Sequence, residues 1–176
     1  MIRTGIGFDA HRLVTGRRLV LGGVEIPHER GLEGHSDADV LAHALMDALL
    51  GAVADGDIGQ HFPPSEARWK DADSLALLRR VAARVRAAGW RIVNTDATVL
   101  AEAPRLAPHV PEMRRRLADA MALPADAVSV KATTVEGMGA IGRREGISAM
   151  AVATVRRAPG GRKRLIEKET EHNAVL

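Results

Sequence analysis

Residues 34–51 read GHSDADVLAHALMDALLG and carry the clearest structural signal in this 176-residue chain. Their apolar side chains recur every three or four positions, as on the buried side of an amphipathic helix. The apolar stripe consists of Val40, Leu41, Ala44, Leu45, Ala48, Leu49 and Ala52. We therefore predict a helix over residues 38–54, with Ser36 or Asp37 as its N-cap, because short polar side chains accept hydrogen bonds from the first helical amides.

The segments on either side predict a sheet and two further helices. Alternating or apolar runs predict strands at residues 2–8, 18–26, 91–100, 128–134 and 147–155, with a bulge or bend at Gly22-Gly23. Helical spacing predicts helices at residues 73–88 and 111–121, whereas residues 56–67 predict a loop. Because strands and helices do not alternate strictly, we expect an α+β fold, a mixed sheet with helices packed on one face. The simplest way to cover the other face of the sheet is association with further copies of the same chain in a homo-oligomer.

The length of the chain favours one domain, which we place at residues 1–158. Apolar residues make up 46% of the sequence, enough for a core. Pro159-Gly160-Gly161 indicates a boundary, and the charged, aperiodic residues 159–176 are predicted to form a mobile tail.

The composition also excludes several classes of function. Cysteine is absent, so a metal site must use histidine and carboxylate ligands. Aromatic residues are only 2% of the chain and the net charge is +3, which argues against a nucleic-acid surface. The first residues lack the apolar core of a signal peptide, and no apolar run reaches ~18 residues. We expect a cytoplasmic protein that binds no membrane.

Three polar side chains predict a zinc site. Asp9 and His11 lie two residues apart, so they project to the same side of a strand, just beyond its predicted end. His43 lies on the central helix with Asp39 and Asp47 one turn to either side. Two nitrogens and one oxygen make a three-ligand set with an open position, as in catalytic zinc sites, and Asp47 or a backbone carbonyl would orient a ligating ring. The alternatives are a chance surface pairing or a hydrogen-bonded pair for Asp9 and His11, and a solvated polar stripe for the helix face.

Two further places suit phosphate. The N-terminus of the central helix, beside His35 and Ser36, offers free amides and a positive dipole, although Ser36 is equally explained as a cap. The hydroxyls of Thr133 and Thr134 and the loop amides after them would also bind phosphate, and Glu136 would hold a hard divalent cation. The alternatives here are ordinary strand propensity for the threonines and an exposed turn for Glu136.

The motifs together resemble one enzyme family. They are FDAH at residues 8–11, GHSDAD at 34–39, LAHALMDALLG at 41–51, GDIG at 56–59, APRL at 103–106 and VKATTVE at 130–136. In this order they resemble the 2-C-methyl-D-erythritol 2,4-cyclodiphosphate synthases of the non-mevalonate isoprenoid pathway. The resemblance covers residues 2–157, nearly the whole chain.

The resemblance implies a phosphorus–oxygen lyase. Its substrate would be 4-diphosphocytidyl-2-C-methyl-D-erythritol 2-phosphate, whose 2-phosphate attacks the β-phosphorus and expels CMP without a protein nucleophile. The resemblance implies Zn²⁺ on Asp9, His11 and His43, and Mg²⁺ or Mn²⁺ at Glu136. His35 and Thr134 would stabilise the transition state by positioning and charge neutralisation.

The family also implies a substrate pocket in two parts. Asp57, Ile58 and Gly59 would hold the erythritol, and residues 101–107 with Thr133 would line the cytidine pocket. The full set of expected substrate-binding residues is Asp9, His11, His35, Ser36, Asp57, Ile58, Gly59, Phe62, Glu66, Ala101, Arg105, Leu106, Ala107, Ala132, Thr133, Thr134 and Arg143. The resemblance further implies a homotrimer, with sheets facing the three-fold axis and the cytidine pocket across a subunit boundary.

The chain departs from the family pattern at three positions. Pro64 stands where the family often has aspartate, Arg105 where it usually has lysine, and Ala140 where it has an aromatic residue near the trimer axis. Two other functions remain open on the residues alone. One is a zinc-dependent phosphohydrolase with Asp57 or Asp37 as base. The other is a non-catalytic trimeric binding module.

Overall fold

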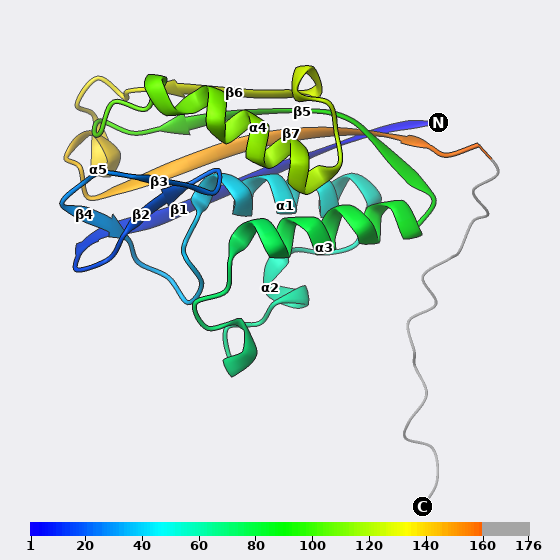
Figure 1. Ribbon diagram of the computed structural model, residues 1–176, viewed down its shortest axis with the longest axis horizontal. Helices are drawn as coiled ribbons and strands as arrows, with labels where there is room; N and C mark the ends of the chain where they lie inside the picture. Colours follow the sequence, from blue (N-terminus) through cyan, green and yellow to red (C-terminus); the bar gives the residue numbers. More distant parts are fainter. Residues whose placement is uncertain (160–176) are drawn as a thin grey trace, which may run out of the picture.

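The computed structural model describes residues 1–159, which form a five-stranded sheet with helices against it and a separate two-stranded sheet (Figure 1). The five strands lie in the order β4-β1-β7-β5-β6. Their bounds are β1 Ile2–Thr15, β4 Arg30–Leu32, β5 Trp90–Leu100, β6 Val128–Thr133 and β7 Gly146–Arg157. Strands β5 and β6 are parallel and the other neighbours are antiparallel, which confirms the predicted mixed sheet.

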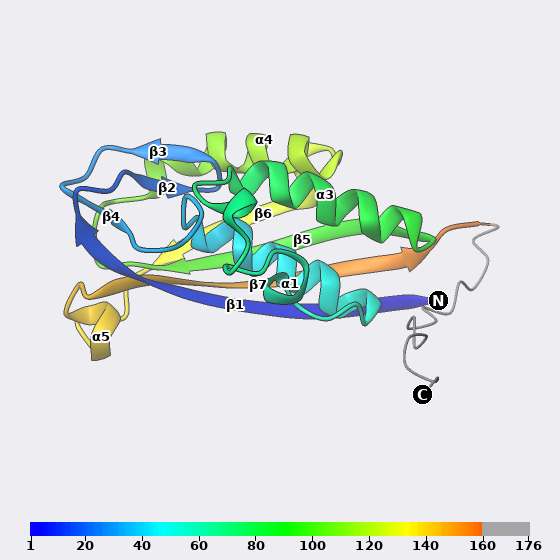
Figure 2. The same cartoon turned by 90° about the horizontal axis from the view of Figure 1, so that it is seen from below.

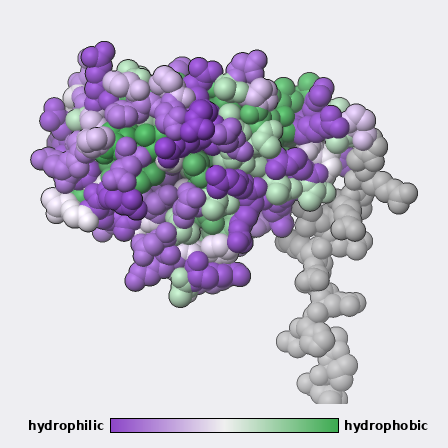
Figure 3. Space-filling model, in the orientation of Figure 1, coloured by the Kyte–Doolittle hydropathy of each residue, from purple (hydrophilic) through white to green (hydrophobic). Residues whose placement is uncertain are grey.

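The long helices lie on one side of this sheet (Figure 2), as the α+β prediction requires. They are α1 Val40–Val53, α3 Ser74–Ala87 and α4 Val110–Met121. Short elements are the helices α2 Ile58–His61 and α5 Gly139–Gly142, and the 3₁₀ turns Ala67–Trp69, Ala107–His109 and Ala125–Ala127. The core lies between the helices and the sheet, where the apolar stripe of α1 is almost fully buried. The side of the molecule that carries the helices is mainly hydrophilic on its surface (Figure 3).

Helix α1 lies directly on strand β1 because two glycines leave room for it. A Cβ atom added at Gly7 would lie 1.9 Å from the carbonyl oxygen of Ala44, and one at Gly5 would lie 2.1 Å from that of Ala48. No side chain fits at either position without moving the helix. This close approach brings the middle of α1, including His43, next to the following residues of β1.

Strand β1 is longer than predicted. It pairs with β7 from Ile2 through Arg12 and then with β4 from Leu13 through Thr15. Asp9 and His11 therefore lie within a paired strand and not beyond its end. The alternation of side chains still places both on the side of the helices, as the i, i+2 spacing predicts.

The prediction of one bulged strand at residues 18–26 is wrong. Strands β2, Leu19–Leu21, and β3, Val24–Ile26, form a hairpin. Gly22 and Gly23 are its two-residue turn, with φ angles of +58° and +73°, the left-handed pair that a type I′ turn requires. Sequence reasoning also missed strand β4.

The N-cap of α1 is Asp39, and not Ser36 or Asp37 as predicted. Its carboxylate accepts hydrogen bonds from the amides of Ala42, Gly22 and Gly23 at 3.0, 2.9 and 2.7 Å. Burial, together with the charge of Asp37, raises the pKa of Asp39 to about 6. Asp39 thus joins the helix to the β2–β3 turn and lies inside the protein. The alternative interpretation, that Asp39 belongs to a solvated polar stripe of the helix, is therefore excluded.

The remaining predictions of elements are mostly confirmed. Helix α3 ends as expected, with Gly89 in the left-handed region at φ +81°. Helix α4 has a proline in its first turn and buries Met113 and Leu117 completely. The expected loop at residues 56–67 contains helix α2, whose N-cap is Asp57. The predicted mobile tail lies outside the described residues, apart from residue 159.

On β1 and β7, the sheet face away from the helices is apolar and uncovered by any residue among 1–159. Ile6 and Phe8 of β1 are 66% and 59% exposed, and Met150 and Val152 of β7 are 45% and 40% exposed. Ile6 pairs with Val152 and Phe8 with Met150, so the four side chains form one contiguous patch, the bare sheet face. No helix within residues 1–159 is long and apolar enough to cross a bilayer.

Candidate active site

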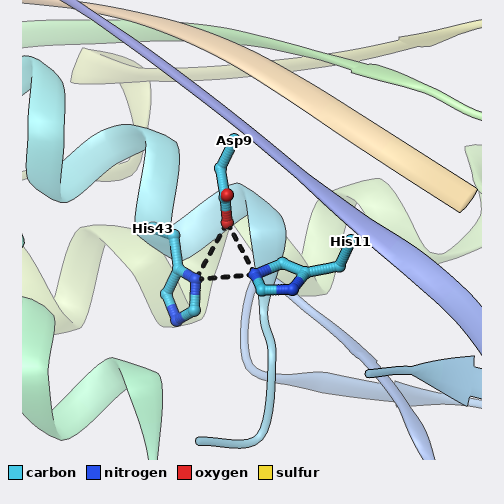
Figure 4. Close-up of side chains that lie close together, drawn as sticks. All are labelled: Asp9, His11 and His43. Carbon is cyan, nitrogen blue, oxygen red and sulfur yellow. Dashed lines mark hydrogen bonds and ion pairs between the residues drawn. The ribbon is translucent and has the colours of Figure 1, made fainter. Parts of the chain in front are cut away.

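Asp9, His11 and His43 converge in the structure, as the sequence predicts (Figure 4). Asp9 Oδ2 lies 2.9 Å from His11 Nε2 and 2.9 Å from His43 Nδ1. The two ring nitrogens are 3.2 Å apart. The carboxylate and the first imidazole come from β1 and the second imidazole from α1, so the packing of these two elements creates the group.

The ring of His11 is oriented by a backbone carbonyl. His11 Nδ1 lies 2.7 Å from the carbonyl oxygen of Glu33, and since that oxygen can only accept, Nδ1 carries the hydrogen and Nε2 keeps its lone pair. The expected role for a backbone carbonyl is thus confirmed, whereas Asp47 does not contact a ligating ring. Its carboxylate accepts from the amide of Ile58 at 2.8 Å instead, which ties α1 to α2.

His43 is only 8% exposed, and both of its ring nitrogens have polar contacts. Its Nε2 atom lies 3.0 Å from Ser74 Oγ and 3.2 Å from Ser36 Oγ. The Nδ1 atom faces Asp9 and His11. The polar face of α1 is therefore an interior, hydrogen-bonded surface at this position too.

The three side chains influence one another's protonation. Burial alone would raise the pKa of Asp9, but hydrogen bonds and attraction from His11 and His43 outweigh it and lower that pKa below its ordinary value of 3.8. Burial would lower the pKa of His11, but its contact with Asp9 raises that pKa above 6.5. Asp9 thus favours the protonated form of His11, whose second hydrogen lies on Nε2, the atom that would bind a cation.

The donor set fits a zinc ion. Zinc bound at ~2.0–2.1 Å in a tetrahedron requires ligand atoms ~3.3–3.4 Å apart. The observed separations of 2.9–3.2 Å need only a few tenths of an ångström of expansion. Two imidazoles and one carboxylate are ligands of catalytic zinc, and the set leaves a fourth position free.

The free position opens into a cavity of about 260 Å³. Five of the predicted substrate-binding residues besides the metal ligands line it, namely His35, Ser36, Ile58, Gly59 and Phe62. The family departure Pro64 lies in its wall as well. The size of the cavity suits a small phosphorylated molecule.

Two other predicted residues lie beside the cavity and not in its lining. The carboxylate of Asp57 accepts from the amide of Gln60 at 3.0 Å and from its side-chain amide at 2.7 Å. These bonds to Gln60 lower the pKa of Asp57. Glu66 pairs with Arg68 at 2.5 Å, and its backbone carbonyl lies 3.5 Å from His35 Nε2.

The other predicted residues form a second group at the opposite edge of the sheet. It comprises Ala101, Arg105, Leu106, Ala107, Ala132, Thr133, Thr134 and Glu136, whereas Arg143 lies on the side of β1, because it pairs with Glu145, whose carbonyl oxygen accepts from the amide of Leu13. In one cross-strand row, Asp9 pairs with Ala149, Ala149 with Val99, and Val99 with Ala132. Three strand spacings of ~4.8 Å place the groups roughly 14 Å apart. One chain therefore does not bring the Asp9–His11–His43 group and the residues predicted to line the cytidine pocket together.

The loop of this second group is held by Glu102, which lies in the segment 101–107 predicted to line the cytidine pocket but has no predicted role in holding a loop. Glu102 Oε1 accepts from the amides of Val135 and Gly137 at 2.9 and 3.2 Å. These two amides are therefore already bonded, whereas the sequence predicts loop amides that are available for phosphate. Between them, Glu136 has a left-handed backbone with φ +54° and accepts from Thr134 Oγ1 at 2.7 Å. No local pattern marks Glu102, because its partners lie 33 and 35 residues along the chain.

Comparisons with known proteins agree over nearly the whole chain. The model of the YgbB family matches residues 2–156. The 2-C-methyl-D-erythritol 2,4-cyclodiphosphate synthase of Salinibacter ruber is 62% identical over 157 residues, which cover 89% of this chain and 100% of that protein.

Solved structures are similar as well. The bifunctional IspDF from Campylobacter jejuni has a TM-score of 0.86 at 40% identity, covering 89% of this chain and 42% of that one. A CDP-bound 2C-methyl-D-erythritol-2,4-cyclodiphosphate synthase has a TM-score of 0.81 at 36% identity, covering 88% of this chain and 100% of that one. The residues that the family model matches include both side-chain groups described above.

Proposed function

The chain belongs to the YgbB family of 2-C-methyl-D-erythritol 2,4-cyclodiphosphate synthases, and we propose how its two groups of side chains carry out that activity. It is a phosphorus–oxygen lyase of the non-mevalonate isoprenoid pathway. It converts 4-diphosphocytidyl-2-C-methyl-D-erythritol 2-phosphate to the cyclic 2,4-diphosphate. The observation that carries the assignment to this site is the triangle of Asp9, His11 and His43 in the lining of a cavity of about 260 Å³.

The reaction is an internal phosphoryl transfer. An oxygen of the 2-phosphate forms a bond to the β-phosphorus, and the anhydride bond to the α-phosphate breaks, so that CMP leaves with the electron pair. Zn²⁺ at the triangle and Mg²⁺ or Mn²⁺ at Glu136, when bound, supply the positive charge that neutralises the phosphates. His35 and Ser36 hold the phosphate end in the cavity, and Ile58 and Gly59 enclose the erythritol. Positioning and charge stabilisation account for catalysis without a protein nucleophile.

The cytidine end binds at the second group of side chains. Solved relatives contain CDP, in agreement with a cytidine-linked substrate. Arg105 is exposed and supplies the positive charge that the family usually takes from lysine. Thr134 and Glu136 are joined by a hydrogen bond, and Glu136 would hold the second metal ion, whose positive charge would neutralise the diphosphate.

We further propose a homotrimer in which each active site lies between two chains. The separation of roughly 14 Å between the two groups supports this arrangement, because one substrate must touch both. The bare sheet face, with Ile6, Phe8, Met150 and Val152, supplies an apolar surface for association around a three-fold axis. A cytoplasmic location remains a prediction from the sequence.

Two alternatives predict different products. A zinc-dependent phosphohydrolase would release linear phosphates, and a binding module would release nothing. Named synthases at 62% and 60% identity favour the cyclase over both. Incubation of the protein with substrate, Zn²⁺ and Mg²⁺ should give CMP and a cyclic diphosphate in equal amounts by ³¹P NMR. Linear phosphates as the main product would reject the assignment.

The shared site is tested by complementation. His43→Ala damages the metal group and Arg105→Glu damages the nucleotide group, so each homotrimer should be inactive. After exchange of subunits at equal concentrations, about one quarter of the sites combine two intact halves, and about a quarter of wild-type activity should return. Verified mixed trimers without activity, in conditions where wild type survives exchange, would place both halves in one chain.

A further inference from the structure

We propose that Asp37 and Ser74 form a hydrogen-bond chain that fixes the ring tautomer of His43 required for metal binding. This inference rests on the proposed metal-binding function of His43 and assigns positioning roles to two residues outside the ligand set. Both precede or open α-helices, so their side chains first suggest caps. Their contacts show a different use.

The direction of the chain follows from the carboxylate of Asp37. Ser74 Oγ lies 2.5 Å from Asp37 Oδ1, and the amide of Ser74 donates to Asp37 Oδ2 at 3.0 Å. An ionised carboxylate has no hydrogen to give, so the hydroxyl hydrogen of Ser74 points at Asp37. Ser74 Oγ can then act only as an acceptor towards His43 Nε2, 3.0 Å away.

This direction decides the tautomer of His43. Nε2 must carry the hydrogen that Ser74 accepts, which leaves the lone pair of the neutral ring on Nδ1. Nδ1 faces Asp9 and His11, and the carboxylate of Asp9, 2.9 Å away, competes with Ser74 for the single hydrogen of the neutral ring. The Asp37–Ser74 pair draws that hydrogen to Nε2, so that Nδ1 can bind a metal. With the opposite tautomer, a hydrogen would point into the ligand triangle, and the ring would lose one position for a metal.

The neighbouring groups keep the chain in place. Ser74 is fully buried, and Asp37 Oδ1 also accepts from the amide of Asp39 at 3.3 Å. Ser36 Oγ lies 3.2 Å from His43 Nε2 and accepts from the amide of Ala38 at 3.1 Å. Its hydroxyl is free to donate or accept, so Ser36 follows the tautomer that Ser74 sets.

Two substitutions distinguish loss of the hydrogen-bond chain from reversal of its donor–acceptor direction. Ser74→Ala removes the acceptor for Nε2–H. In Asp37→Asn, the amide oxygen should stay on the shorter backbone contact, 3.0 Å to Ser74 N, and turn its NH₂ group towards Ser74 Oγ. Ser74 must then donate to His43 Nε2, which favours hydrogen on Nδ1. Reversal should therefore harm metal binding more than loss.

The measurements are zinc affinity, by competition with a chelator, and the His43 tautomer, by ¹⁵N NMR of the zinc-free protein. Loss of a partner of a metal-ligating histidine typically weakens affinity ~10–100-fold. We expect zinc affinity to fall about 10-fold in Ser74→Ala and about 100-fold in Asp37→Asn. Only in Asp37→Asn should the ¹⁵N signals of His43 shift to those of the Nδ1–H tautomer. In a protein that already carries Ser74→Ala, the further change Asp37→Asn should weaken zinc affinity by less than about threefold, because only the loss of the negative charge of Asp37 then remains.

Controls separate this inference from the proposed function. Thr95→Val removes another buried hydroxyl, one without a hydrogen-bond partner among residues 1–159, and should leave zinc affinity unchanged. His43→Ala must abolish zinc retention if the metal site itself is right. If it does so, while Ser74→Ala and Asp37→Asn keep the wild-type tautomer and stay within about threefold in affinity, the hydrogen-bond chain is rejected and the metal site stands.

Discussion

Replacing Gly7 by alanine should separate helix α1 from strand β1 and pull the metal site apart. The new Cβ atom would lie 1.9 Å from the carbonyl oxygen of Ala44 and 2.7 Å from the amide nitrogen of Ala48. Side-chain carbons need at least 3.0 Å here, so the helix must move by about 1.1 Å. His43 precedes Ala44 and moves with it, away from Asp9.

The displacement predicts two measurable losses. Overpacking of this kind costs ~1–3 kcal/mol, which urea unfolding of the zinc-free protein would detect. A shift of about 1.1 Å is several times the ~0.2 Å tolerance of a metal–ligand distance, so zinc affinity should fall at least about tenfold. Chelator competition measures this fall in protein that remains folded.

Two other glycines supply matched controls. Gly5→Ala creates a similar clash, 2.1 Å from the Ala48 carbonyl, but one helical turn farther from His43, so it should cost similar stability and less zinc affinity. Gly51→Ala lies in the same helix, where its Cβ would meet only the carbonyl oxygen of Ile6 at 3.8 Å. It should keep zinc affinity and gain up to ~1 kcal/mol from helix propensity. Equal zinc losses in Gly7→Ala and Gly5→Ala would refute the reasoning, because the effect would then be global.

Three further predictions concern protonation, the second metal ion and the end of the chain. Contact with Asp9 raises the pKa of His11 above 6.5, so protonated His11 stabilises the zinc-free protein below pH 6.5, and this stability is lost as the pH rises through the raised pKa. Zinc affinity should increase over the same pH window, because the proton on His11 must leave before zinc binds. Calorimetry that also detects proton release would measure this increase. Glu102→Ala should free the loop around Glu136 and raise the Mg²⁺ concentration for half-maximal activity about tenfold, with bound zinc unchanged; an unaltered Mg²⁺ titration would count against this. Removing residues 159–176 should leave activity and oligomeric state intact, and a monomeric product in size-exclusion chromatography would contradict the single-domain boundary.

The sequence predicts the long elements well because their patterns span several periods. Helices α1, α3 and α4 each repeat the apolar spacing over three turns or more. The three-residue strand β4 and the four-residue helix α2 contain too little of a period to be recognised. Gly22-Gly23 fits a bulge and a turn equally on sequence alone, and only the pairing of β2 with β3 decides.

The metal ligands were predictable because their geometry is local to two elements, a strand alternation and one helix face. The partners of those ligands were not, because each contact joins distant segments. Ser74 is 31 residues from His43, and its sequence context indicates only a helix start. The prediction of the N-cap of α1 failed for a related reason. Ser36, Asp37 and Asp39 can all cap a helix, but Ala38 has a left-handed backbone, with φ +57°, and this turn of the chain places Asp39 at the N-cap.

Strand β1 ties the proposed oligomer to the metal site through its alternation. Gly5 and Gly7 face α1 and, with Asp9, belong to one side of the strand, whereas Ile6 and Phe8 belong to the bare sheet face. A slip of one residue against β7 would exchange the two sides, placing Phe8 against α1 where only glycine fits and turning the carboxylate of Asp9 away from the helix. The register is thus fixed by steric exclusion on one side before any metal or partner binds. The same pairing that closes the metal site therefore exposes the apolar surface proposed for the trimer, so in that proposal the strand that carries Asp9 and His11 would also recruit the second half of each active site.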